Sequence, residues 1–171
     1  YQRQDIDFMT AGFKEFFSQN PDVLIQFVGT TGSGNKISDK IKAAIPAANL
    51  LLTNPKLRLE ALSMTARSHV LYYIGWKGYR GIYSGKIFEY LGLQRNILLA
   101  PSDNDVNAAL IDETKSGKVA DTIEEMVAVL SGWYQEWKHT GRLQYEGNTA
   151  AIKKYTREKQ SEILAETILA N

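Results

Sequence analysis

Asp103, Glu113 and Lys115 have the order and spacing of a metal-dependent nuclease site. In such a site an Asp precedes a Glu-x-Lys triplet, the carboxylates hold Mg²⁺, and the Lys assists the attacking water. Glu89 is a fourth candidate ligand. The nuclease interpretation requires residues 110–115 to form a central strand, whereas their composition also fits an exposed acidic helix.

The same segment has some features of a calcium-binding loop. Asp103, Asp105 and Asn107 occupy the first three ligand positions of an EF-hand, but Ala108 stands where Gly is required and Glu113 comes one position early. The two histidines lie far apart in the sequence, and neither has a carboxylate at metal-ligand spacing. The sequence therefore predicts no metal ion and no cofactor.

A glycine-rich segment at residues 23–38, VLIQFVGTTGSGNKIS, is close to a phosphate-binding loop. That loop needs a Lys directly after its last Gly to reach the phosphates, and then a hydroxyl to hold Mg²⁺. Here Asn35 takes the place of the Lys, which arrives one position late. We therefore expect a turn that binds at most an anion at a helix start, with a degenerate nucleotide site as the second alternative. The candidate anion-binding residues are Gly32, Gly34, Lys36 and Ser38.

The segment from Arg67 to Arg95 alternates seven aromatic residues with five basic ones. Bases stack on aromatic side chains while cations meet phosphates, so this pattern suits single-stranded nucleic acid. It equally suits a protein interface, or core aromatics flanked by cations that reach the solvent. The candidate contact residues are Arg67, Tyr72, Trp76, Lys77, Tyr79, Arg80, Tyr83 and Lys86.

The composition is that of a globular protein. The 171 residues are 44% hydrophobic and 23% charged, and the absence of cysteine excludes disulfides and thiolate chemistry. No apolar run approaches the roughly 18 to 20 residues that span a bilayer, so no membrane span is expected. Acidic residues interrupt the N-terminal segment, which does not read as a signal peptide. A cytoplasmic or virion-like location is favoured, although the missing initiator Met leaves a removed leader open.

Charge is distributed unevenly along the chain. The net charge is +1, but five basic residues and one acidic residue give residues 67–95 a charge of +4, and eight acidic residues and two lysines give residues 103–136 a charge of −6. The blocks form either two solvated faces of one domain or complementary surfaces on neighbouring copies in a head-to-tail assembly.

Hydrophobic periodicity predicts mostly helices. Six segments have the spacing or end signals of helices: 5–19, 38–45 with continuation to about residue 53, 55–77, 84–91 ended by Gly92, the segment capped by Asp121, and 149–169. Residues 23–28 and 105–114 fit either a helix or a strand, and residues 139–148 fit a loop or a short hairpin.

The leading interpretation is one mainly α domain, residues 1–171, with about six helices and room for two or three short strands. We expect it to work by binding rather than by catalysis. It would be a structural or coat-like subunit that self-assembles into a homo-oligomer, or a module that docks onto a protein or a nucleic acid. The metal-dependent nuclease is the alternative from another class.

Overall fold

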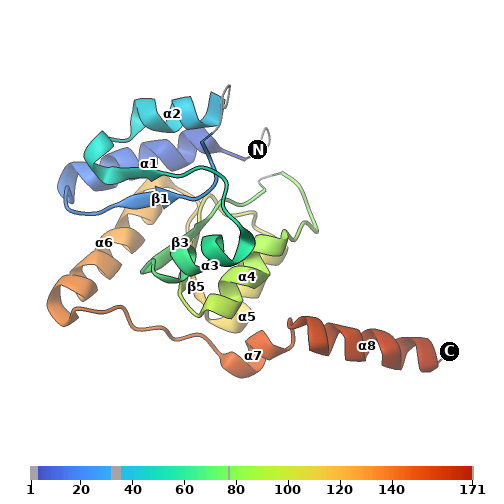
Figure 1. The fold of residues 1–171 in the computed structure, drawn as a ribbon. Coiled ribbons are helices and arrows are strands. Elements are labelled where there is room, and N and C mark those ends of the chain that lie inside the picture. The colour runs from blue at the N-terminus through green and yellow to red at the C-terminus, as the bar shows by residue number, and fades with distance from the viewer. Residues whose placement is uncertain (1–3, 32–35, 77, 171) are drawn as a thin grey trace.

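Helices alternate with short strands in the computed structural model, which describes residues 4–31, 36–76 and 78–170 (Figure 1). The helices are α1 (Ile6–Gln19), α2 (Lys36–Ala44), α3 (Arg58–Ala66), α4 (Gly85–Leu93), α5 (Val106–Thr114), α6 (Ile123–Thr140), α7 (Thr149–Lys153) and α8 (Arg157–Leu169), with a 3₁₀ turn at Ala47–Asn49. The strands are β1 (Ile25–Phe27), β2 (Leu50–Leu52), β3 (Val70–Tyr73), β4 (Asn96–Leu99) and β5 (Gly117–Val119). The prediction of a mainly helical fold with some short strands is confirmed at this coarse level.

The strands form two parallel sheets. One has the order β3-β4-β5, with Leu71 paired with Ile97 and Leu99 paired with Val119, and the other pairs β1 with β2. Parallel neighbours need a crossover connection, and a helix supplies each one: α2 from β1 to β2, α4 from β3 to β4, and α5 from β4 to β5. The alternation of strand and helix was not predicted.

Helices cover both faces of the three-stranded sheet. Side chains alternate between the faces along β4: Leu98 joins the cluster with α1 and α6, while Ile97 and Leu99 join the cluster with α4 and α5. All four residues of β4 are buried, as expected for a central parallel strand. On the first face α1 packs directly on α6, where Phe16 meets the ring of Tyr134 edge-on at 6.3 Å between centroids.

Glycine is required where backbones come close. A Cβ on Gly117 would lie 1.9 Å from the carbonyl oxygen of Ile97 on the neighbouring strand. A Cβ on Gly75 would lie 2.4 Å from the carbonyl oxygen of Pro101, which follows a cis peptide bond. The loops after β3 and β4 therefore touch at the carboxyl end of the sheet.

Polar caps set several helix boundaries. Thr122 and Glu125 form a capping box at the start of α6, so the predicted cap at Asp121 is one residue early. The side chain of Thr156 accepts a hydrogen bond from the amide of Lys159 and starts a new helix, which divides the predicted helix 149–169 into α7 and α8. The predicted cap at Ser38 is also wrong, because α2 begins at Lys36.

The long helix predicted over 55–77 is wrong in its second half. α3 ends at Ala66, and Val70–Tyr73 form a strand instead. The run Val-Leu-Tyr-Tyr is rich in residues that favour strands, and it pairs with β4. This pairing determines the conformation of the run, although its apolar residues also have helical spacing. For the same reason Leu50–Leu52, placed in a helical continuation, form β2 beside β1. No strand lies within 141–148, so the loop alternative holds there.

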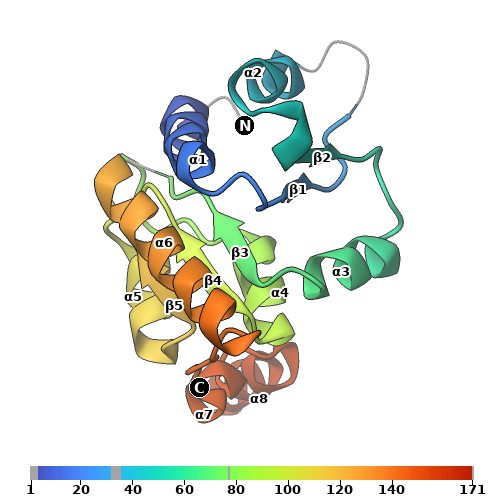
Figure 2. The same cartoon turned by 90° about the vertical axis from the view of Figure 1, so that its left-hand side faces the viewer.

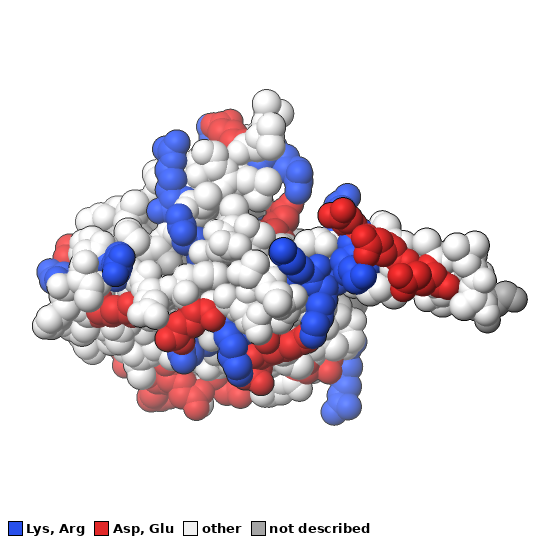
Figure 3. All heavy atoms as spheres, turned by 90° about the horizontal axis from the view of Figure 1, so that it is seen from below, with Lys and Arg blue, Asp and Glu red and all other residues white. Residues whose placement is uncertain are grey.

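α8 extends away from the rest of the molecule (Figure 1). None of its residues is buried, and Leu164, Ile168 and Leu169 are 61%, 65% and 85% exposed. Acidic side chains run along this arm (Figure 3). In the described part of the chain, no helix has the length and the apolar character needed to cross a membrane.

Candidate functional site

A cleft of about 690 Å³ lies between β1 and β3. Both strands line it, with α1 and α6 on one face of the sheet and α3 and α4 on the other. Figure 2 shows the β1–β2 pair standing apart from β3. The volume falls in the range of about 300 to 1,000 Å³ that is usual for small-molecule sites.

The path of the chain explains where the cleft opens. From β1 the chain crosses through α2 to β2, and no residue of β2 lines the cleft. From β3 it crosses through α4 and α5 to β4 and β5, away from β1. Where successive connections leave in opposite directions, a crevice forms beyond the carboxyl ends of the strands, and ligands of open parallel sheets bind in it.

Each strand beside the cleft uses its other edge for pairing. The amide of Thr53 donates to the carbonyl of Phe27, and the amide of Ala100 donates to the carbonyl of Tyr73. The edges that face the cleft are therefore those not used for β1–β2 and β3–β4 pairing. At the carboxyl end, Gln4 Nε2 donates to the carbonyl of Ile74 at 3.4 Å, which links the residues before α1 to the residue after β3.

The N-terminus of α4 faces the mouth of the cleft. Ser84 and Lys86 line the cleft. The Ser84 side chain makes no capping hydrogen bond to the helix, and its hydroxyl accepts a hydrogen bond from the Tyr73 hydroxyl at 3.0 Å. The first amides of a helix carry partial positive charge and lack intrahelical partners. A Cβ at Gly85 would meet nothing within 4 Å, so this turn is open. Amides and the exposed Lys86 can together bind an anion.

One turn further along α4, Glu89 also lines the cleft. Its Oε1 accepts hydrogen bonds from Nε and Nη2 of Arg58 at 3.1 and 3.0 Å, which ties α3 to α4. Tyr90, from the same turn, and Tyr72, from β3, add aromatic surface. Burial raises the pKa of the Tyr72 hydroxyl, so this side chain stays neutral.

The opposite end of the cleft is bounded by Asp22 and aromatic residues of α6. Asp22 accepts hydrogen bonds from the hydroxyl of Tyr134 at 2.5 Å and from Lys138 Nζ at 3.5 Å. The Tyr134 hydrogen bond is the main reason that the pKa of the Asp22 carboxyl lies below its usual value. Trp137 packs edge-on against the ring of His69 at 5.7 Å between centroids.

The loop after β4 grips the start of α5. Asp103 Oδ2 accepts from the amide of Asn107 at 3.0 Å, and Oδ1 accepts from the amide of Ala108 at 3.1 Å. Asp103 therefore satisfies the helix N-terminus, although the sequence assigned it a metal or catalytic role.

The same loop holds the connection between β3 and α4. Asn107 Nδ2 donates to the carbonyl of Ile82 at 2.9 Å, and Asp105 Oδ2 accepts from the amide of Gly81 at 2.5 Å. The pKa of Tyr83 is raised mainly by burial and further by Asp103 and Asp105. Two loops at the carboxyl edge of the sheet are thus joined by direct hydrogen bonds.

The structure divides the predicted aromatic-basic contact residues between two places. Arg67, Tyr72 and Lys86 line the cleft. Trp76, Tyr79, Arg80 and Tyr83 belong to the connection between β3 and α4, and Lys77 lies outside the described residues. Apart from half-buried Trp76, these connection residues are exposed.

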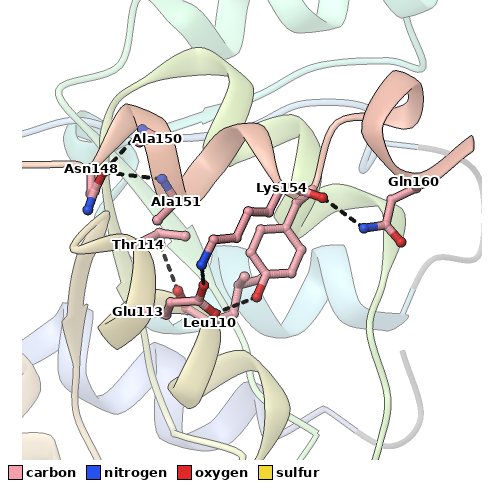
Figure 4. Close-up of polar contacts among 9 residues, drawn as sticks. Leu110, Glu113, Thr114, Asn148, Ala150, Ala151, Lys154 and Gln160 are labelled. Atoms are coloured by element: carbon pink, nitrogen blue, oxygen red, sulfur yellow. Dashed lines mark hydrogen bonds and ion pairs between the residues drawn. The ribbon is translucent and has the colours of Figure 1, made fainter. Parts of the chain in front are cut away.

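The three residues of the predicted nuclease site are not brought together. Asp103 lies before α5, whereas Glu113 lies in its last turn and Lys115 follows it, so the required strand at 110–115 is a helix and turn. Glu113 accepts hydrogen bonds from Lys154 Nζ at 2.8 Å and from the hydroxyl of Tyr155 at 2.6 Å (Figure 4). Lys115 pairs with Asp112. Within residues 4–31, 36–76 and 78–170, no three His, Asp or Glu side chains are grouped to hold a metal ion.

The glycine-rich segment runs from β1 to α2, and a strand before it and a helix after it are also the neighbours of a phosphate loop. Thr30 lines the cleft, and the amides of Thr30 and Thr31 donate to the carbonyl of Thr53. Lys36 is exposed at the first position of α2, and Ser38 is buried in its first turn. Gly32 and Gly34 lie outside the described residues.

The cleft itself could not be recognised from the sequence. Its walls combine Phe27, Tyr90 and Trp133, which are far apart in the chain and carry no common motif. The apolar run Ile97–Ala100, which leads into Pro-Ser-Asp-Asn-Asp, is typical of a strand entering a functional loop, but no residue of that loop lines the cleft.

Known families offer no guide to the role of this site. The chain matches no model of a known protein family, and no curated protein sequence matches it.

Proposed function

We propose that the chain binds a small phosphorylated molecule with an apolar or aromatic group, of which nucleotides are the commonest class. The phosphate would lie at the N-terminus of α4, and the ring would enter the cleft between β1 and β3. The observation that carries this proposal is the position of the cleft, at the point where the crossover connections reverse.

The charges at the mouth of the cleft support an anionic ligand. Lys86 forms no ion pair within the described part of the chain, and it projects from the first turn of α4. Charge-assisted hydrogen bonds from a lysine and from helix amides are the usual partners of a phosphate. Glu89 also lines the cleft, and its negative charge is compensated by the ion pair with Arg58 at 3.0 Å.

Apolar and aromatic side chains deeper in the cleft support a ring-bearing ligand. Phe27 and Tyr72 approach from the two strands, and Trp133 approaches from α6. Binding pockets combine such surfaces with a few polar groups that fix orientation. The two parts of the cleft therefore match the two parts of a nucleotide.

Calorimetric titration with ADP, GDP, UDP and inorganic phosphate tests the proposal. We expect at least one nucleotide to bind, and Lys86→Ala to weaken that binding by about tenfold, since a hydrogen bond to a charged group contributes roughly 1.5 to 3 kcal/mol. The matched control is Lys153→Ala, an exposed lysine of α7 that does not line the cleft. The absence of binding by the unaltered protein at millimolar nucleotide would overturn the proposal.

A second candidate function is docking onto a macromolecule through the connection between β3 and α4. Tyr79 and Tyr83 are 39% and 43% exposed there and flank the exposed Arg80. Fluorescence anisotropy with a single-stranded oligonucleotide tests nucleic-acid binding, and Arg80→Ala together with Tyr79→Ala should abolish it.

Charge-driven self-assembly is tested by sedimentation, which should show oligomers at low salt that dissociate at high salt. A monomer at both salt concentrations would rule out charge-driven self-assembly.

A further inference from the structure

We propose that Asn107 is a positioning residue for the ligand site: it holds the connection between β3 and α4, and with it the first turn of α4, at the mouth of the cleft. This inference rests on the proposed function, because the site that Asn107 would position is the proposed phosphate site at the start of α4. Asn107 does not line the cleft, so any effect on binding must pass through the loop that it holds.

The contacts of Asn107 are fixed on both sides. The residue is fully buried, and its Nδ2 donates to Asp103 Oδ2 at 2.6 Å and to the carbonyl of Ile82 at 2.9 Å. Asp103 is itself held by the main-chain amides of Asn107 and Ala108. A carboxylate and a carbonyl only accept hydrogen bonds, so the amide of Asn107 has one allowed orientation.

That orientation leaves Asn107 Oδ1 buried without a hydrogen-bond partner among the described residues. A buried polar atom in this state costs free energy and needs a reason. Of the two side-chain hydrogen bonds that Asn107 donates, the one to Ile82 reaches a distant part of the chain, two residues before Ser84. The hydrogen bond to Ile82 supplies that reason, because it fixes the loop that leads into α4.

The loop depends on these outside contacts. Gly78 and Gly81 have φ of +82° and +70°, and a Cβ on either would meet nothing within 4 Å. Asp105 Oδ2 provides a second attachment through the amide of Gly81. The third attachment, from Tyr73 to Ser84, reaches the N-cap of α4. The rigid element that carries two of these attachments is the start of α5, which is buried against the sheet.

The first test compares Asn107→Ala with Thr114→Val, measured by calorimetry with the nucleotide that binds the unaltered protein most tightly. Thr114 is equally buried at the other end of α5, where its hydroxyl donates to the carbonyl of Leu110 at 2.6 Å. We expect both variants to lower the melting temperature, and only Asn107→Ala to raise Kd, by about tenfold. Equal Kd values for Asn107→Ala and the unaltered protein would overturn the inference and leave the proposed function intact.

A second pair of variants covers the case in which Asn107→Ala does not fold. Asp105→Asn keeps an acceptor for the amide of Gly81 and should retain the affinity, whereas Asp105→Ala removes the acceptor and should lose severalfold. Identical affinities for the two Asp105 variants would contradict a positioning role for the start of α5.

Hydrogen exchange separates the inference from the proposed function. Without any ligand, amides of residues 78–86 should exchange faster in Asn107→Ala than in Thr114→Val at matched stability. If these amides exchange faster in Asn107→Ala and no nucleotide binds, the role of Asn107 in holding the loop is supported and the proposed function fails. If exchange in this loop is the same in both variants, Asn107 does not hold the loop and the inference is wrong.

Discussion

The three-stranded sheet and the β1–β2 pair consist of the same kind of element but differ in burial. Every residue of the central strand β4 is buried between two helical layers, whereas no residue of β1, β2 or the edge strand β5 is fully buried. The difference arises because a cleft runs along one edge of β1, and because Leu51 points to solvent. Parallel strands are usually covered on both faces, as β4 is. We infer that the three-stranded sheet, built around β4, is the scaffold of the cleft and that the β1–β2 pair is its wall.

Replacing a central leucine gives the largest expected effect. Leu98→Ala, in the centre of β4 and 0% exposed, should lower the free energy of unfolding by roughly 3 kcal/mol, because it leaves a cavity between the sheet and α1. Leu51→Ala, at 39% exposure in β2, should cost less than about 1 kcal/mol. Urea denaturation measures both. Equal losses would erase the distinction between scaffold and wall.

Glycine substitutions come next in size. Gly117→Ala should lower the free energy of unfolding by about 2 kcal/mol in urea denaturation, since the new methyl group would collide with the main chain of Ile97 and push β4 and β5 apart.

Gly92, which was expected to end its helix, lies inside α4 with open space around it. Gly92→Ala should therefore stabilise the protein by about 0.5 to 1 kcal/mol. A loss of stability in Gly92→Ala would show that the described space is occupied.

A smaller effect is expected where α7 meets α5. The hydrogen bond to Glu113 is the main cause that raises the pKa of Tyr155 to about 12. Because this pKa is raised by folding, its contribution is complete below the ordinary tyrosine value of about 10 and is lost as pH rises from there to 12. Melting temperatures across that range should therefore fall less for Tyr155→Phe than for the unaltered protein. Tyr79→Phe, in the exposed loop, serves as the control, and a profile for Tyr155→Phe that matches the unaltered protein would refute this assignment.

The smallest effect is expected in α8. Ile168→Ala should change the free energy of unfolding by less than about 0.5 kcal/mol, because the side chain is 65% exposed and makes no core contact. A large destabilisation measured in dilute solution would mean that α8 packs on another surface there. Repeating the urea titration at several protein concentrations would reveal whether a second copy supplies that surface.

Residues with strong local signals were predictable, and those that depend on distant partners were not. The helix at 5–19 and the start of the helix at Ser84 follow from apolar spacing and capping types that act within one or two turns. Val70–Tyr73 became a strand because β4, more than twenty residues later, pairs with it. Short parallel strands leave no alternating pattern in the sequence, since both of their faces are covered.

The candidate site shows the same limit. Arg67, Tyr72 and Lys86, which were selected for their chemistry, line the cleft, but the sequence grouped them with residues of the connection between β3 and α4 that lie outside the cleft. Asp103 was chosen for its charge, yet that charge caps a helix. A side chain's type shows what it can do, whereas its neighbours, which topology supplies, decide what it does.

The packing of α1 on α6 has a consequence for the synthesis of the protein on the ribosome. α1 buries Phe13, Phe16 and Phe17 in a cluster that α6 completes, and more than a hundred residues of chain separate the two helices. At a synthesis rate of about 5 to 20 residues per second, the apolar face of α1 is made roughly 5 to 20 seconds before its partner. During that interval the apolar face of α1 is exposed to chaperones and to other nascent chains. Slower translation before residues 123–140 are made should therefore favour aggregation of the newly made protein.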